Sequence, residues 1–169
     1  MEKLNSLLNR PEYVHAALNH FPLIGLFVAL ALLTTALCLR HRLMTLTGLV
    51  FVCALALSVW PVYSFGESGY DRVLSMADEP GDAFLKYHAA LAHRWVFLYY
   101  LTAGVASLAF GLSWKWPRTA VAGAVVAVLL GTASLIAGIT IAQAGGEIRH
   151  REFRSGPPPH VAEEPSASH

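Results

Sequence analysis

Charged residues are scarce in this sequence: they make up 14% of its 169 residues, and the net charge is +1. No acid occurs between Glu12 and Glu67, and none occurs between Asp82 and Glu147. A balance so close to neutral provides no basic surface for nucleic acid or for an acidic partner. The long uncharged runs also lack the buried acids that a proton-coupled pump or channel uses, so that class is disfavoured.

Cysteine and catalytic motifs are equally scarce. Cys38 and Cys53 both fall inside apolar runs, where we interpret them as small buried hydrophobes rather than as a disulfide or a zinc site. The sequence contains no nucleotide-binding glycine loop, no His-Glu-x-x-His, no Cys-x-x-Cys-His and no recognisable Ser/His/Asp arrangement. The common hydrolases and nucleotide-dependent enzymes are therefore disfavoured.

Hydrophobic residues, by contrast, make up 55% of the chain and give it a mean hydropathy of +0.49. They form four blocks long enough to cross a bilayer, which takes about 20 residues. We therefore predict an all-α integral membrane protein, a four-helix bundle of one domain over residues 1–150, with a polar, proline-rich, disordered tail over 151–169. The predicted spans are 21–39, 43–65, 95–114 and 119–142.

The two shortest connections are positively charged. Residues 40–42 and 115–118 each contain two Lys or Arg residues and no acid, so both turns are expected to be cytoplasmic. Both termini and the loop over 66–82 then lie on the periplasmic side of a bacterial inner membrane. At that outer face, Asn9 is expected to cap the first helix and Asp82 the third.

One element of the sequence occurs twice. His15-Ala-Ala-Leu-Asn-His20 precedes the first span, and His88-Ala-Ala-Leu-Ala-His93 precedes the third. The repeat predicts two helical hairpins related by a pseudo-twofold axis along the membrane normal. Both histidine pairs then reach the same membrane face, together with His150.

The spacing within each pair limits what it can bind. Positions five apart on a helix differ by about 140° and by about 7.5 Å of rise, so one helix cannot place both histidines on one small ion. Two tiers result, with His20 and His93 nearer the membrane and His15 and His88 farther out. Opposed imidazoles from two helices suit a b-type haem. We expect His20 and His93 to be its axial ligands, with His15 and His88 as second-tier ligands of a possible second haem.

Other polar residues at this face extend the hypothesis. Arg94 and Arg149 lie beside the predicted ligands and are expected to pair with haem propionates. Phe65-Gly66-Glu67 and Gly145-Gly146-Glu147 end the second and fourth spans in a similar way, which places two glutamates symmetrically at the outer face. The alternative is a copper, iron or zinc site with mixed imidazole and carboxylate ligands. Its candidate ligands are His15, His20, His88, His93, His150, Glu67 and Glu147.

Two of these motifs also resemble a known family. His15-x4-His20-Phe21-Pro22 and Gly145-Gly146-Glu147-Ile148-Arg149-His150 are similar to the signatures of a bacterial family of predicted four-helix membrane proteins, a domain of unknown function. The resemblance covers about residues 12–151; Ala16 stands where the family often has proline, and Arg151 where it prefers glycine. It implies a four-helix membrane fold. The family's occasional fusion to a Rieske iron–sulfur domain implies a redox setting.

These observations predict a membrane-embedded b-type haem protein that transfers electrons at the outer face. Its partners would be the lipid bilayer and a periplasmic electron-transfer protein or a quinone. We expect it to act as a subunit of a larger respiratory or redox complex rather than as a stand-alone enzyme. The competing hypothesis is a structural or assembly subunit without a cofactor of its own, whose histidines line an interface.

Overall fold

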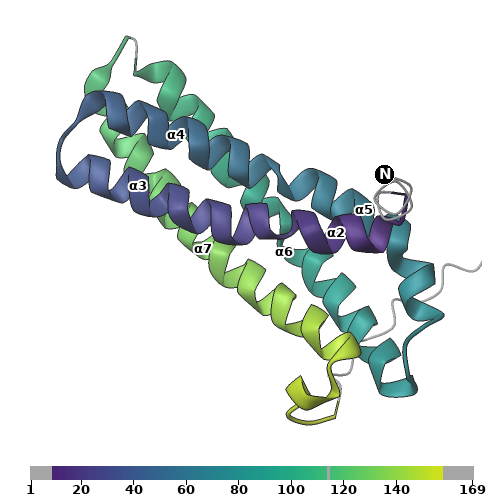
Figure 1. Cartoon of the computed structure of the whole chain (residues 1–169). Helices are drawn as coiled ribbons and strands as arrows, with labels where there is room; N and C mark the ends of the chain where they lie inside the picture. Colours follow the sequence, from purple (N-terminus) through teal and green to yellow (C-terminus); the bar gives the residue numbers. More distant parts are fainter. Residues whose placement is uncertain (1–8, 114, 158–169) are drawn as a thin grey trace, which may run out of the picture.

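The computed structural model describes residues 9–113 and 115–157, and these residues form helices and turns without a strand. Four helical stretches run up and down beside one another (Figure 1). All four are long and apolar enough to cross a membrane. The predicted all-α, four-helix membrane bundle is thus confirmed. The four stretches are Pro11–Cys38, Arg42–Leu74, Glu79–Leu112 and Arg118–Arg149.

Two prolines divide the first two stretches. Proline has no N–H to donate to the carbonyl four residues before it, so a helix is interrupted there. Pro22 lies four residues after Leu18, where the first helix ends, and Pro61 lies four residues after Leu57, where another ends. The resulting elements are α2 (Pro11–Leu18), the π-helical turn η1 (Phe21–Gly25), α3 (Leu26–Cys38), α4 (Arg42–Leu57), α5 (Val59–Leu74), α6 (Glu79–Leu112), α7 (Pro117–Arg149) and the short 3-10 turn η2 (Arg151–Phe153).

Three local predictions near the start of α2 and between α5 and α6 are wrong. The N-cap of α2 is Arg10 rather than Asn9. The predicted loop over 66–82 is mostly helix, because α5 continues to Leu74 with one side packed against α2. The cap of α6 is Asp78 rather than Asp82, since Asp78 Oδ1 accepts a hydrogen bond from the Gly81 N–H at 3.0 Å. Pro80 in the first turn of α6 favours this earlier start.

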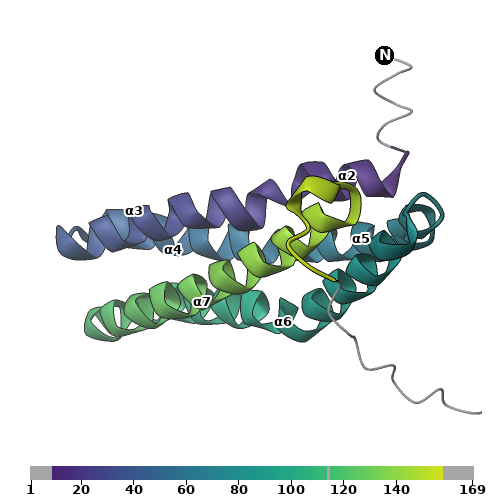
Figure 2. The same ribbon diagram turned by 90° about the horizontal axis from the view of Figure 1, so that it is seen from below.

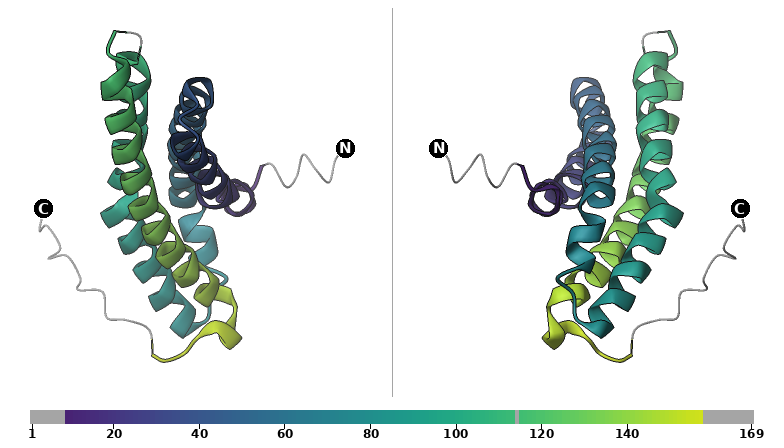
Figure 3. Two further views of the ribbon diagram at one scale, coloured as in Figure 1. Left: turned by 90° about the vertical axis from the view of Figure 1, so that its left-hand side faces the viewer. Right: turned by 90° about the vertical axis from the view of Figure 1, so that its right-hand side faces the viewer.

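The two hairpins form two layers. In Figure 2, the layer with α3 and α4 lies above the layer with α6 and α7. The views along the bundle in Figure 3 show the same two pairs standing beside each other. In the middle of the bundle the layers pack together, mainly through α4 on α6 and α3 on α7. Nearer the chain termini, α2 packs mainly on α5 and α6 mainly on α7.

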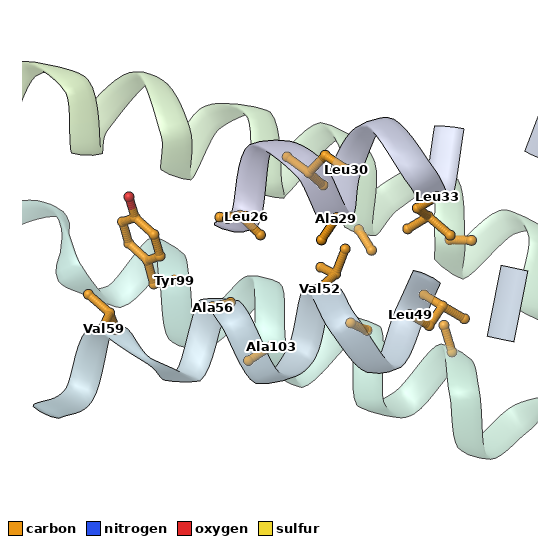
Figure 4. Close-up of a cluster of buried hydrophobic side chains, with 14 residues drawn as sticks. Leu26, Ala29, Leu30, Leu33, Leu49, Val52, Ala56, Val59, Tyr99 and Ala103 are labelled. Carbon is orange, nitrogen blue, oxygen red and sulfur yellow. The ribbon is translucent and has the colours of Figure 1, made fainter. Parts of the chain in front are cut away.

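Small and branched apolar side chains fill the space between the layers. Figure 4 shows Leu26 and Leu33 of α3 and Val52 of α4 directed into this space, and Tyr99 of α6 belongs to the same cluster. Each of these side chains is almost completely buried. Inside a membrane such close packing supplies most of the attraction between helices, because lipid tails are as apolar as the side chains.

The two ends of the bundle differ in charge. We call the end with the two tight turns the basic end, where Arg40, Arg42, Lys115 and Arg118 are all exposed. There the Arg42 guanidinium donates to the Ser113 carbonyl at 3.3 Å, which ties the two hairpins together. We call the opposite end, which includes α2, α5, the α5–α6 turn and the end of α7, the cavity end.

Candidate functional site

The first histidine of each repeat points into the space between the hairpins at the cavity end. His15 of α2 and His88 of α6 have ring centres 6.1 Å apart, and their planes are nearly perpendicular, at 83°. Both side chains are partly buried. His20 and His93, by contrast, are exposed on the outside of the bundle. The structure therefore brings together the expected second-tier pair, whereas neither residue of the expected axial pair lines a cavity between the hairpins.

Each of the two rings is fixed by an equivalent hydrogen bond. Nδ1 of His15 lies 2.8 Å from the Val62 carbonyl oxygen of α5, and Nδ1 of His88 lies 2.8 Å from the Ile141 carbonyl oxygen of α7. A carbonyl oxygen only accepts, so Nδ1 carries the proton and donates it. Nε2 of each ring then keeps its lone pair. Histidines that bind metals are commonly held in this way, with the second ring nitrogen donating to a carbonyl.

A glycine lies against each ring. A Cβ atom at Gly66 would lie 2.9 Å from Nδ1 of His15, and one at Gly145 would lie 3.1 Å from Nδ1 of His88. Real Cβ atoms almost never approach as closely as 2.9 Å, and 3.1 Å is tighter than nine in ten of their contacts, so a larger residue at either position would push against the ring. These contacts make Gly66 equivalent to Gly145, so Glu67 corresponds to Gly146 and not to Glu147. The expected symmetric pair of glutamates is therefore wrong by one residue of register.

The two rings separate two cavities. The larger, of about 490 Å³, extends from His15 and His88 toward the open end of the bundle. The smaller, of about 80 Å³, lies on the other side of the rings and reaches Tyr99 and Gly138. The larger cavity exists because α2 packs on α5 and α6 packs on α7, which leaves the hairpins apart at this level. We call it the outer cavity.

Glu12 is a residue of the outer cavity that the sequence reading missed. It lies on α2 one turn before His15, and its side chain is only 7% exposed. One carboxylate oxygen is 2.9 Å from Nε of Arg72, and the other has no hydrogen-bond partner among the described residues. In the sequence, Glu12 is simply an acid in the first turn of a helix, which the helix dipole favours in any protein. Its position three residues before His15 is the signal that points to the site.

Of the two glutamates and two arginines predicted for the site, only one of each lines the outer cavity. Glu67 is exposed and lines the outer cavity, whereas Glu147 is buried and lies outside the lining. Arg149 lies at the cavity's open end, so it is well placed for an anionic group. Arg94 instead stacks on the Trp95 ring, with its guanidinium 5.1 Å from the ring centre, outside the lining.

His150 also lies at the open end of the cavity but away from the histidine pair. Its Nδ1 is 3.0 Å from a carboxylate oxygen of Glu152, and its ring packs on Phe153 with centres 5.0 Å apart. Over residues 9–113 and 115–157, no three His, Cys, Asp or Glu side chains are gathered in a way that could hold a metal ion. The mixed set of histidines and glutamates expected for a small ion is thus not assembled there.

Comparison of the chain with models of protein families, with curated proteins and with solved structures finds no match. The geometry of the site is therefore the main evidence on function. It consists of two oriented imidazoles, one from each hairpin, at the inner end of a cavity that opens at one end of a membrane bundle.

Proposed function

We propose that the protein is a membrane-embedded b-type haem protein that transfers electrons at the outer face, with His15 and His88 as the axial ligands. The observation that carries the proposal is the pairing of these two rings across the hairpins, each with Nδ1 bonded to a carbonyl. This pairing leaves both Nε2 atoms free to bind iron. A bound haem would supply one-electron redox chemistry.

The spacing of the rings supports this proposal. Two imidazoles bound to opposite sides of one metal ion have ring centres about 6 Å apart, since each metal–nitrogen bond is about 2 Å and the ring adds about 1 Å on each side. The observed separation is 6.1 Å. The helices that carry the two rings need little rearrangement to reach such a spacing.

The number of available ligands favours haem over a small ion. A zinc site takes three or four protein ligands, whereas haem brings four nitrogens of its own and needs only two axial groups. The described part of the chain offers two oriented imidazoles and no cluster of three ligand side chains. Arg149 at the cavity mouth supplies a cation for a propionate.

The position of the site supports electron exchange at a membrane surface. The four stretches have 28 to 34 residues, more than the roughly 20 that cross the hydrocarbon core. With the basic end in the cytoplasm, the cavity end projects on the periplasmic side. A periplasmic electron-transfer protein or a quinone would meet the haem there.

A difference spectrum tests the proposal. The protein is produced with ample haem, purified in detergent, and measured oxidised and after reduction with dithionite. We expect a reduced α band typical of b-type haem, and its loss in a His15→Ala/His88→Ala double variant that unfolds at the same temperature as the wild type. A wild-type protein that remains colourless under these conditions contradicts the proposal.

A further inference from the structure

The two histidine rings lie where the two cavities meet. His15 and His88 line both the outer cavity and the smaller one beyond the rings, which we call the inner cavity, and so do Asn19, Tyr63 and Ala92. A flat macrocycle bound by both Nε2 atoms would therefore extend into both cavities. The inference drawn below rests on the proposed function, because it concerns which edge of the haem enters the inner cavity.

The inner cavity is small and mainly apolar. Its volume is about 80 Å³, and no Asp, Glu, Lys or Arg of the described part of the chain lines it. Aliphatic side chains from η1, α5, α6 and α7 form much of its lining: Leu23, Val59, Val62, Val96 and Ile141. The outer cavity is larger and is lined by charged residues, among them Glu12, Glu67 and Arg149. The cavity on one side of the rings thus suits apolar groups, and the cavity on the other side suits polar groups.

The inner cavity reaches as far as Tyr99 and Gly138. Tyr99 is 2% exposed, and its hydroxyl lies directly against Gly138, where a Cβ atom would overlap the hydroxyl oxygen and lie 2.8 Å from Cδ2 of Leu23. In the register set by the histidine rings and their glycines, Tyr99 and Gly138 correspond to Leu26 and Val59 of the first hairpin. The second hairpin therefore has an aromatic ring beside a glycine where the first has two branched aliphatic residues. The depth of the inner cavity depends on this glycine, because a larger residue would push Tyr99 or Leu23 out of place.

We propose that the inner cavity determines which porphyrin binds: it receives the vinyl-bearing edge of haem b, and Gly138 keeps Tyr99 in the position that leaves room for this edge. The propionates, which lie on the opposite edge of the macrocycle, then face the outer cavity, where Arg149 supplies a cation. Such a site accepts short apolar groups on the inner edge and rejects charged ones, because an unpaired charge is costly to bury. Gly138 is thus a specificity-determining residue, while His15 and His88 bind the iron.

Two iron porphyrins that differ from haem b only at the vinyl positions test the proposal. Mesohaem carries ethyl groups there, and coprohaem III carries propionates. Each is titrated into the full-length protein in detergent, and binding is followed by the low-spin absorption spectrum. We expect mesohaem to bind within about threefold of haem b, and coprohaem III to bind about a hundredfold more weakly or worse, since its added carboxylates would enter an apolar cavity.

The outcomes separate this inference from the proposed function. Equal affinities for haem b and coprohaem III would overturn the inference and leave the proposed function intact, because haem would still bind through the two histidines. If none of the porphyrins gives a low-spin spectrum, the proposed function fails and this inference fails with it. The comparison uses the wild-type chain, so it does not depend on whether a variant folds.

Gly138→Ala tests the residue itself. We expect its affinity for haem b to fall about tenfold or more, and its affinity for deuterohaem, which has hydrogen atoms at the vinyl positions, to fall less than about threefold, because crowding affects the larger group more. Adding Tyr99→Phe removes the hydroxyl that the new Cβ meets, and should restore much of the binding of haem b. Gly131→Ala in the same helix is the matched control: its Cβ crowds Leu30 in the core, outside the lining of both cavities, and should leave the ratio of the two affinities unchanged. A wild-type ratio in Gly138→Ala would overturn the role of Gly138.

Discussion

His15 and His88 are related by the internal symmetry of the bundle. Their ring centres lie 6.1 Å apart. Nδ1 of His15 donates to the Val62 carbonyl of α5, and Nδ1 of His88 donates to the Ile141 carbonyl of α7, so each bond joins the two arms of one hairpin. The sequence separations of the two hydrogen bonds are 47 and 53 residues, so each bond closes one hairpin. The same contact made twice therefore fixes both rings and leaves the Nε2 lone pair of each one available.

The angle between the rings predicts the magnetic signature of a bound haem. Their planes are 83° apart. Axial imidazoles held nearly perpendicular give oxidised low-spin haem a highly anisotropic electron paramagnetic resonance signal, whereas parallel rings give a rhombic one. We expect the highly anisotropic signal at low temperature in the haem-loaded protein. A rhombic or a high-spin spectrum would show that other ligands, or only one of these rings, bind the iron.

The two glycines beside the rings should be intolerant of substitution. Gly66→Ala places a Cβ 2.9 Å from Nδ1 of His15, and Gly145→Ala places one 3.1 Å from Nδ1 of His88. Each ring must then shift by a few tenths of an ångström or more, which disturbs its hydrogen bond to the carbonyl. We expect each variant to lose about 1–3 kcal/mol of stability, the usual cost of overpacking, and to bind haem more weakly.

Gly104→Ala is the matched control for these variants, because a Cβ there meets no atom within 4 Å. It should keep the wild-type Tm and haem affinity. Haem titration and thermal unfolding in the same detergent measure both quantities. Tight haem binding by Gly66→Ala and Gly145→Ala, equal to that of Gly104→Ala, would argue against a role for the two rings as positioned here.

The Glu12–Arg72 ion pair should stabilise the fold, because Arg72 compensates the charge of a buried carboxylate. Glu12 is 7% exposed and Arg72 is 48% exposed, so removing the arginine leaves a buried carboxylate without its cation. We expect Arg72→Ala to lower the free energy of unfolding by about 1–3 kcal/mol. Adding Glu12→Gln should restore part of that loss, since a neutral amide is cheaper to bury. Thermal unfolding of the single and double variants decides the matter: additive losses in the double variant would contradict a coupled pair.

The contacts of Arg151 and Arg154 with Asp78 contribute stability that depends on pH. The Arg154 guanidinium and the other donors around Asp78 lower the pKa of that carboxyl from its usual 3.8 to about 2. A carboxyl with a lowered pKa in the folded state stabilises the protein fully above its unfolded value, and this stabilisation is lost as the pH falls through about 2. We expect Tm in detergent to fall between about pH 5 and pH 2, and to fall less steeply in Asp78→Asn. Parallel curves for the two proteins would show that other carboxyls dominate.

Most of the fold could be predicted from the sequence. The apolar blocks determine four spans, and the duplicated His-Ala-Ala-Leu element indicates two hairpins. The α5 extension could not be predicted, because it depends on packing against α2. The cap at Asp78 is a local feature, and Pro80 in the first turn of α6 is the sequence signal for it. The polar residues after Gly66 are typical of a loop, yet α5 stays helical because Gly69 lets it pack against the backbone of α2 at Glu12.

The choice between the two histidine tiers could not be made from spacing. Residues five apart on a helix face directions about 140° apart, so only one histidine of each pair can point inward. Which one does so depends on the rotation of α2 and α6 about their axes, and this is set by packing against α5 and α7. Gly66 and Gly145, in the helices that face the rings, mark the inward pair as His15 and His88.

We propose that His15 and His88, and not His20 and His93, are the residues that would hold the cofactor. Haem titration of the four single alanine variants, followed by optical spectra, tests it most directly. We predict that His15→Ala and His88→Ala lose the six-coordinate low-spin spectrum and regain it with added imidazole, while His20→Ala and His93→Ala bind haem as the wild type does. Loss of the low-spin spectrum in the His20 and His93 variants, with its retention in the other two, would contradict the account.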